Sequence, residues 1–249
     1  RQAPLAARMR PRTLEEYAGQ QHILKPGMLL RRAIEADRIQ SLIFYGPPGT
    51  GKTTLAQIIA NRTESKFERL SGVESNVAEM RRVLSGAANR LENTGRPTLL
   101  FIDEIHRLNR VVEEVLYSAM EDFTLDIIIG EGPGARTVKI DLPHFTLVGA
   151  TTRAGLLTSP LRERFGIQFR LNFYDPEELK TIILRAAALL GIEIVEEASL
   201  ELARRARGTP RIANRLLKRC RDFADMETSG VITLPLIEKS LEKMRIDLE

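Results

Sequence analysis

The sequence is poor in residues that would indicate a membrane protein, a zinc site or an oxidising compartment. Its 249 residues include one cysteine, three histidines and no tryptophan, and aromatic residues make up only 5%. The single Cys220 cannot form an internal disulfide, which favours a reducing compartment such as the cytoplasm. The histidines are scattered, so they form no zinc-like cluster. No apolar run approaches the ~20 residues of a membrane-spanning helix, and no signal-peptide pattern is visible.

The chain also lacks a strong net charge. It has 37 Lys and Arg residues against 33 Asp and Glu residues, which gives a formal net charge of +4. This balance permits contact with nucleic acid without requiring it, because a mixed charged surface gives the same sum. Hydrophobic residues make up 43% of the sequence, enough to fill the core of one large or two modest globular domains.

The most informative stretch joins an apolar strand, 41–45, to a glycine-rich turn and an apolar-striped helix. The turn fits the pattern G-x-x-x-x-G-K-[ST], whose backbone N–H groups surround nucleotide phosphates. We expect Lys52 to place a cation between the terminal phosphates and Thr53 to ligate Mg²⁺. A plain glycine-rich turn is the alternative, but the flanking strand and helix favour nucleotide binding. The expected nucleotide-binding residues of this loop are Gly46, Pro47, Pro48, Gly49, Thr50, Gly51, Lys52, Thr53 and Thr54.

A second apolar run, 98–102, leads directly into two carboxylates, Asp103 and Glu104. Such a run is typical of a strand buried on both faces of a parallel sheet. Open α/β sheets bind ligands at the carboxyl ends of their strands, so Asp103 is the candidate Mg²⁺ ligand and Glu104 the candidate residue for polarising the attacking water. A pair of solvated carboxylates is the alternative.

A third apolar run, 145–150, ends in Thr151 and Thr152. Their hydroxyls could sense the γ-phosphate or hold the attacking water. A short helix is expected from 159 to 165, followed by a fifth core strand at 167–171.

Residues 126–142 have the pattern of a β-hairpin inserted before the third apolar run. Three consecutive isoleucines, 127–129, lead into a glycine-rich tip, and apolar residues then alternate with polar ones up to residue 142. A plain surface excursion and a partner-binding arm are both open interpretations.

The last third of the chain is almost wholly helical in pattern. We therefore expect an α/β nucleotide-binding domain over residues 1–174 and a small helical domain over residues 175–249. The expected helices, separated by glycines, are 176–190, 197–207, 210–225 and 233–245.

Taken together, these motifs resemble the AAA+ ATPases over essentially the whole chain. The resemblance implies an α/β fold of the P-loop AAA+ type, with a parallel five-stranded sheet flanked by helices, an inserted β-hairpin and a C-terminal helical lid. Several long stretches look like the RuvB family, the bacterial ATPases that drive Holliday-junction branch migration; these are 102–123, 145–153, 159–167 and 207–213.

The resemblance also implies roles for individual residues. Arg164 is expected to be the arginine finger, acting on nucleotide bound to a neighbouring subunit, because a guanidinium stabilises charge on the transferring phosphoryl group. Arg162 is a nearby alternative, and an Arg164 paired on its own surface is another. Thr152 would be the first sensor, with Thr151 the less favoured choice, and Arg211 would be the second sensor.

The resemblance further implies ATP or ADP with Mg²⁺ as cofactors. The expected adenine-binding residues are Arg10, Pro11, Tyr17, Ile23 and Tyr174, with Pro210 and Arg211 contributing from the helical domain. The hairpin 126–142 resembles the arm by which RuvB binds its partner RuvA.

The first part of the chain resembles RarA, also called MgsA, a related replication-fork maintenance ATPase. This likeness rests on residues 5–14, 29–35 and 41–45, and on Thr50 within the phosphate loop. We therefore hypothesise a RarA–RuvB chimera, engineered or natural, joined between about Thr98 and Val111.

Three functions follow from these resemblances. The first is a RuvB-like motor that couples ATP hydrolysis to DNA branch migration in recombination and repair. The second is a RarA-like replication-fork ATPase, and the third is an engineered nucleotide-binding scaffold with little motor activity. RuvB would continue into a winged-helix DNA domain beyond the lid, whereas this sequence ends at Glu249. We expect a homo-oligomeric ring to be required for activity, since a monomer lacks the neighbour's finger, and a bacterial, cytoplasmic, nucleoid-associated location without membrane attachment.

Overall fold

The computed structural model describes residues 8–130, 132–227 and 230–244. The chain divides into two compact units, each built from more than one segment. One unit holds residues 22–46 and 55–170, and the other holds residues 1–21, 47–54 and 171–249. Among the described residues, no helix is both long and apolar enough to cross a membrane.

The first unit is built on a five-stranded sheet in the order β2-β3-β6-β1-β7. Every neighbouring pair of strands is parallel, with Leu42 opposite Val148 and Leu100 opposite Leu147. This arrangement confirms the α/β fold with five parallel strands. The strands are β1 (Leu42–Tyr45), β2 (Lys66–Ser71), β3 (Thr98–Asp103), β6 (Thr146–Thr151) and β7 (Ile167–Arg170).

Helices flank this sheet and supply its hydrophobic core. Apolar residues of α5 and α6, among them Met80 and Leu116, pack in one buried cluster with Leu100 and Ile102 of β3. Asparagine side chains accept a backbone N–H at the start of both helices, as N-caps commonly do. The helices of this unit are α2 (Gln21–Leu24), α3 (Leu29–Glu35), α4 (Lys52–Arg62), α5 (Val77–Thr94), α6 (Arg110–Glu121) and α7 (Ser159–Glu163); α2 and α4 each begin in the other unit.

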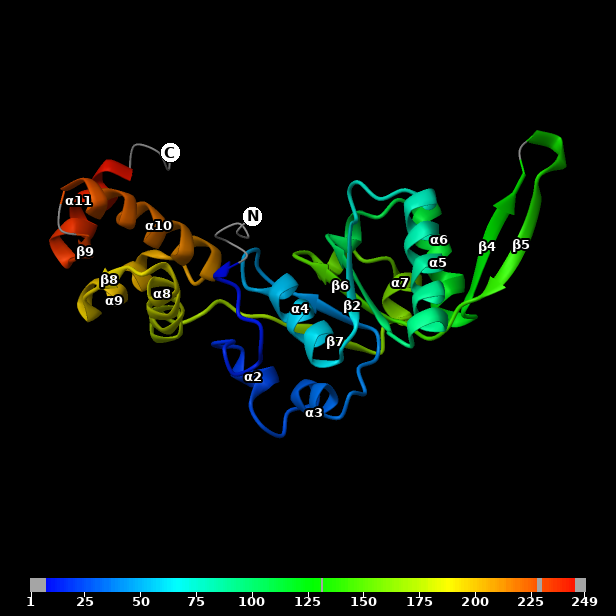
Figure 1. Ribbon diagram of the computed structural model, residues 1–249, viewed down its shortest axis with the longest axis horizontal. Helices are drawn as coiled ribbons and strands as arrows, with labels where there is room; N and C mark the ends of the chain where they lie inside the picture. Colours follow the sequence, from blue (N-terminus) through cyan, green and yellow to red (C-terminus); the bar gives the residue numbers. More distant parts are fainter. Residues whose placement is uncertain (1–7, 131, 228–229, 245–249) are drawn as a thin grey trace. The chain divides into compact units, whose positions relative to one another are not determined.

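The expected hairpin is present and antiparallel. Its strands β4 (Thr124–Ile129) and β5 (Arg136–Asp141) are joined by a turn that contains the short 3₁₀ helix η2 (Gly132–Gly134). Its base is buried through Leu125 and Leu142, and in Figure 1 the rest extends beyond α5 and α6.

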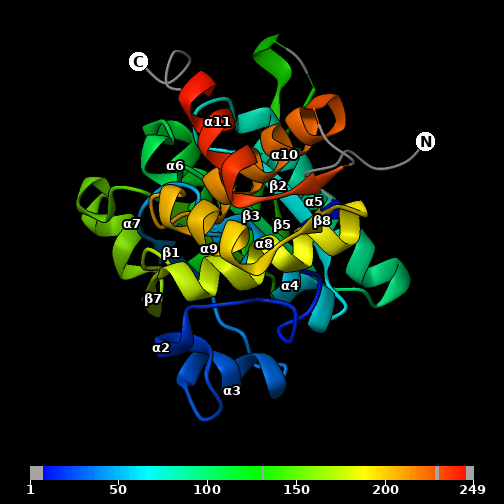
Figure 2. The same ribbon diagram turned by 90° about the vertical axis from the view of Figure 1, so that its left-hand side faces the viewer.

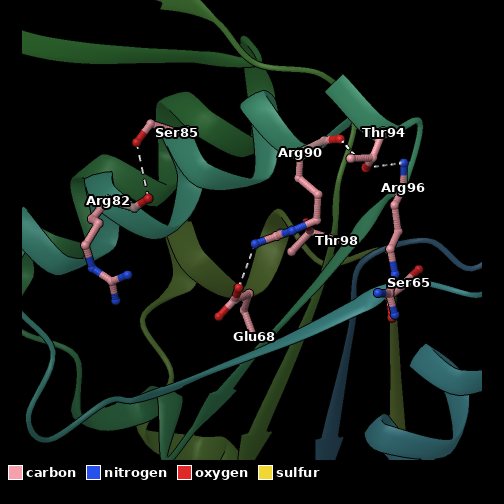
Figure 3. Close-up of polar contacts among 8 residues, drawn as sticks. All are labelled: Ser65, Glu68, Arg82, Ser85, Arg90, Thr94, Arg96 and Thr98. Carbon is pink, nitrogen blue, oxygen red and sulfur yellow. Dashed lines mark hydrogen bonds and ion pairs between the residues drawn. The ribbon is translucent and has the colours of Figure 1, made fainter. Parts of the chain in front are cut away.

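Polar contacts join the end of α5 to the edge of the sheet, as Figure 3 shows. The guanidinium of Arg90 donates to Glu68 on β2 at 2.8 Å and to the Thr98 hydroxyl on β3 at 2.6 Å. After the helix, the Arg96 side chain donates to the carbonyl oxygen of Glu64 at 3.0 Å. Because β2 is an edge strand, these contacts fix α5 to a part of the sheet that has a neighbour on only one side.

The second unit contains the helical lid, whose helices α8 to α11 are labelled in Figure 2. Asp175 and Glu178 form a reciprocal capping box at the start of α8, with Pro176 as the first helical residue, and Gly191 ends the helix in a left-handed conformation. Leu202 and Leu217 are among the residues of a shared apolar core. The helices are α8 (Pro176–Leu190), α9 (Glu196–Arg205), α10 (Pro210–Glu227) and α11 (Leu234–Met244).

The lid also contains a short parallel pair that the helical pattern did not predict. It joins β8 (Glu193–Ile194) to β9 (Val231–Ile232). Strands of two residues are too short to produce a recognisable hydrophobic alternation.

We predict that Arg90→Met lowers the free energy of unfolding by about 1–2 kcal/mol, because a half-buried Glu68 and the Thr98 hydroxyl lose their charged donor. The matched control is Arg82→Met on the same helix, where the exposed Arg82 side chain makes no contact with the drawn residues in Figure 3. Chemical denaturation followed by far-ultraviolet circular dichroism measures both. An equal loss in the two variants would contradict a role for the Arg90 contacts.

Candidate functional site

The phosphate-loop residues 47–54, the N-terminal segment and the lid lie in one unit, and together they form a cavity of ≈ 90 Å³. This volume is several times the ~10–15 Å³ needed for a water molecule. Five of the expected nucleotide-pocket residues line it together with Gly51 and Thr54; these are Arg10, Pro11, Tyr17, Tyr174 and Pro210. Ile23 is not among the lining residues and is buried in the other unit.

The sequence did not single out several other side chains of this cavity. Arg185 of α8 donates to the Met9 carbonyl oxygen at 2.9 Å and pairs with Glu16 at 2.8 Å, which fixes the N-terminal segment against the lid. Asn214 and Ile182 also line the cavity. These residues lie on regular amphipathic helices, where sequence spacing alone does not separate a pocket residue from a core residue.

Two buried tyrosines form one wall of the cavity. The Tyr174 hydroxyl lies 3.1 Å from both the Tyr17 hydroxyl and the carbonyl oxygen of Thr50. Burial raises the pKa of Tyr17 well above its ordinary value and also raises the pKa of Tyr174, so both phenols are neutral. A Cβ atom on Gly51, which has φ +101°, would lie 2.8 Å from the Tyr17 hydroxyl. A glycine is therefore required at this point of the loop.

The Lys52 side chain of the phosphate loop is buried. Lys52 is 8% exposed, and its ammonium donates to the Pro47 carbonyl oxygen at 2.7 Å, as does the Thr50 hydroxyl at 2.8 Å. Gly49 has φ +79°, and a Cβ atom there would lie 3.1 Å from Cβ of Arg211. The candidate second sensor thus lies beside the phosphate loop within the same unit. Left-handed glycines with a buried ammonium and threonine hydroxyls fit the phosphates of a nucleotide with Mg²⁺.

The candidate metal ligand and base lie at the end of β3, in the other unit. Asp103 is the last residue of the strand, and its carboxylate is 2.7 Å from the guanidinium of Arg69 on β2. Glu104 follows with φ 52° and ψ 42°, a left-handed conformation that non-glycine residues rarely adopt. A Cβ atom on Gly72 would lie 2.2 Å from the Glu104 carbonyl oxygen. Arg69 and Gly72 carry no recognisable sequence signal, because it is the pairing of β2 with β3 that brings them to the end of β3.

His106, in the 3₁₀ helix η1 (Ile105–Arg107), connects the end of β3 with the end of β6. Its side chain is 7% exposed, and burial lowers its pKa. Nδ1 lies 2.8 Å from the Thr151 hydroxyl at the end of β6, and Nε2 lies 3.9 Å from the Glu104 carboxylate. Thr152, the candidate first sensor, is half-buried just beyond the strand, so the hydroxyl engaged by His106 belongs to its neighbour.

Arg164, the candidate arginine finger, is held by residues of its own subunit. Its guanidinium is 2.9 Å from the Glu121 carboxylate, donates to the Pro160 carbonyl oxygen at 2.6 Å and lies 4.0 Å from the centre of the Tyr117 ring. Its side chain is 17% exposed. The alternative finger, Arg162, donates to two backbone carbonyl oxygens of the preceding loop.

Residues 9–171 match the model described as the Holliday junction DNA helicase RuvB P-loop domain, and residues 174–247 match the RuvB AAA lid domain. The chain belongs to the RuvB family. The first RuvB match spans both sides of the junction suggested between Thr98 and Val111, and the RarA–RuvB chimera stays a hypothesis. The domain division at residues 174 and 175 likewise stays a prediction.

Solved structures of RuvB from Thermotoga maritima are similar over most of this chain. The protein described as a Holliday junction branch migration motor is 43% identical with a TM-score of 0.81, covering 96% of this chain and 74% of that one. Two variants of the same protein give 43% identity with a TM-score of 0.82 and 44% with 0.81. The first covers 95% of this chain and 73% of that one, and the second 96% and 74%.

We predict that Gly51→Ala weakens ADP binding about tenfold or more, because the left-handed strain of ~1–3 kcal/mol adds to the overlap with Tyr17. Gly27→Ala is the matched control, since Gly27 has φ +90° but no atom within 4 Å of the added Cβ. Titration with a fluorescent ADP analogue measures both. Unchanged affinity in Gly51→Ala would contradict the proposed nucleotide site.

Proposed function

We propose that this chain is the ATPase core of a RuvB-type motor, which couples ATP hydrolysis to branch migration of Holliday-junction DNA in recombination and repair. The main support is the match of both its P-loop part and its lid to the RuvB family. The similar Thermotoga maritima protein is described as such a motor. We place this protein in the bacterial cytoplasm, in keeping with its family and its single cysteine; association with the nucleoid is part of the proposal.

The nucleotide is held by this chain's own residues as follows. Backbone N–H groups of residues 46–51 surround the phosphates, Lys52 neutralises their charge, and Tyr17 and Tyr174 form the apolar wall for adenine. Thr53 and Asp103 would hold Mg²⁺, which polarises the phosphoryl oxygens when bound. Support comes from the cavity beside the two tyrosines and from the inward position of Lys52.

Hydrolysis requires a positioned water and stabilisation of the transferring phosphoryl group. Glu104 orients and polarises the water, and Thr152 and Arg211 sense the γ-phosphate. Arg164 acts on the nucleotide of a neighbouring subunit, which makes a homo-oligomeric ring part of the mechanism. To do so it exchanges Glu121 for the phosphoryl oxygens, another anionic partner of matching geometry.

The hairpin is the proposed contact with a RuvA-type partner. Its apolar side chains include Ile128, 56% exposed, Ile129, 57% exposed, and Val138, 41% exposed. Ile129 and Val138 share one face of the ribbon and Ile128 lies on the other, because Val138 is opposite Ile127. Exposed apolar side chains on a projecting ribbon are typical of a protein-binding surface.

We predict that Glu104→Gln and Arg164→Ala each lower the ATP turnover rate at least about 100-fold, while ATP binding is retained. Mixing the two variants restores turnover, because some interfaces then join an intact Glu104 to an intact Arg164 from the neighbour. Steady-state phosphate release measures the rates, and Arg162→Ala serves as the control. Turnover that stays at the level of the single variants after mixing contradicts a finger acting between subunits.

We predict that Ile129→Glu weakens binding to RuvA about tenfold or more, because it places a charge on the face of the hairpin that Ile129 shares with Val138. Val111→Glu is the control, since Val111 is 61% exposed on α6 outside the hairpin. Surface plasmon resonance with immobilised RuvA compares the two variants. Equal affinities, or no binding by the unaltered chain at low salt, would reject the hairpin as the contact.

A further inference from the structure

We propose that His106 is a positioning residue for Glu104, and that the hydroxyl of Thr151 sets its orientation. The proposal rests on the function proposed above, in which Glu104 acts on the attacking water. It assigns a task to His106, which has no other role here, and to Thr151, which the resemblance offered only as the less favoured first sensor.

The Thr151 hydroxyl favours one position for the hydrogen on the His106 imidazole. Its oxygen already accepts the backbone N–H of Arg153 at 2.9 Å, so its own hydrogen is free to be donated elsewhere. His106 Nδ1 lies 2.8 Å away and is a suitable acceptor in the neutral ring. A neutral imidazole carries one hydrogen, which then lies on Nε2. Of the two tautomers, the one with hydrogen on Nε2 turns an N–H rather than a lone pair toward the Glu104 carboxylate, so the Arg153 N–H donates to Thr151, Thr151 donates to His106 Nδ1, and the His106 Nε2–H faces Glu104.

The Glu104 carboxylate faces His106 Nε2 but is not fixed by a direct hydrogen bond to it. His106 Nε2 is 3.9 Å and Arg107 Nη1 is 3.8 Å from the carboxylate, longer than a hydrogen bond in both cases. The Glu104 side chain is 40% exposed. A small rotation of the carboxylate, or one bridging water, completes the contact with Nε2–H. His106 thus limits where the carboxylate can point and leaves it able to reach a water.

The backbone supports this geometry from the other side. Gly72 donates its N–H to the Asp103 carbonyl oxygen at 2.7 Å and leaves no room for a side chain beside the Glu104 carbonyl. The left-handed Glu104 backbone is therefore held in place, and the main remaining freedom is in its side chain. Strained residues of this kind are common at functional sites.

The series of contacts from Thr151 through His106 to Glu104, called the relay below, lies where binding of the γ-phosphate can affect it. β3 and β6 are parallel neighbours, with Ile102 opposite Gly149, so Glu104 and Thr151 leave the sheet at the same edge. Thr151 immediately precedes Thr152, the proposed sensor. A displacement of the 151–153 backbone when the γ-phosphate is bound would turn the imidazole and, through it, reorient Glu104.

The first test detects the hydrogen position without any hydrolysis. The chain has three histidines, so heteronuclear NMR of the imidazole nitrogens can assign His106 from the signal lost in His106→Gln. Above the ordinary imidazole pKa we expect a single tautomer with hydrogen on Nε2. Thr151→Val should give a tautomer mixture, and Thr151→Ser should keep the original spectrum. Hydrogen on Nδ1 in the unaltered chain, or no change in Thr151→Val, overturns the proposal.

The second test separates positioning from packing. We expect Thr151→Val to lower kcat about tenfold, as loss of a supporting group commonly does, with KM for ATP changed less than about twofold. Thr151→Ser restores the rate, and Thr151→Val adds little to His106→Ala because both break one relay. Thr146→Val is the control; Thr146 lies at the opposite end of the same strand. Circular dichroism checks that each variant folds. If Thr151→Val does not fold, the kcat of Thr151→Ser is compared with that of His106→Gln instead.

The outcomes distinguish this proposal from the function on which it rests. If the unaltered chain hydrolyses ATP and Glu104→Gln abolishes it, but Thr151→Val retains full kcat, the relay is wrong and the proposed function stands. A serine variant as slow as the valine variant also overturns the relay, because methyl packing would then be responsible. If the unaltered oligomer shows no hydrolysis, the proposed function fails and the relay falls with it.

Discussion

The parallel hydrogen-bond ladder of β1, β6 and β3 is the constraint on which the candidate catalytic groups of the sheet depend. Parallel strands end at one edge, and these strands are buried along almost their full length. Polar side chains would be costly inside such strands unless they were paired, so they occur where the strands end. The Gly46 N–H donates to the Thr151 carbonyl oxygen, which joins the entry to the phosphate loop with the neighbouring strand end.

Much of this arrangement can be predicted from the sequence, because strong local patterns carry it. The continuous apolar runs before Asp103 and Thr151 indicated two core strands, and the glycine-rich tip indicated the hairpin. The contacts of Gly72, Arg69 and His106 could not be predicted in the same way, since each depends on pairing or packing between distant segments. Ile23 is a different case: a family resemblance suggested it for the adenine pocket, whereas the described cavity is lined without it.

The choice between Thr151 and Thr152 shows where a sequence motif loses resolution. Thr151 is the last residue of its strand and Thr152 lies just beyond it, so the two hydroxyls have different surroundings. Thr151 still belongs to β6, is 1% exposed and bonds to His106. The motif thus offers two hydroxyls with different surroundings, of which Thr151 contacts His106 and Thr152 stays the proposed sensor.

The contacts of Arg164 place a requirement on the proposed finger mechanism. Within its own chain the guanidinium has a carboxylate, a backbone carbonyl and an aromatic ring, yet its Nε atom is buried without a hydrogen-bond partner. Leaving these partners costs free energy, which a phosphoryl group must return through bidentate, charge-assisted bonds. The unpaired Nε makes the internal site an imperfect one, because a buried donor without a partner is itself unfavourable. The two positions of the arginine are thus closer in free energy than the number of internal contacts suggests, which is the condition a reversible finger needs.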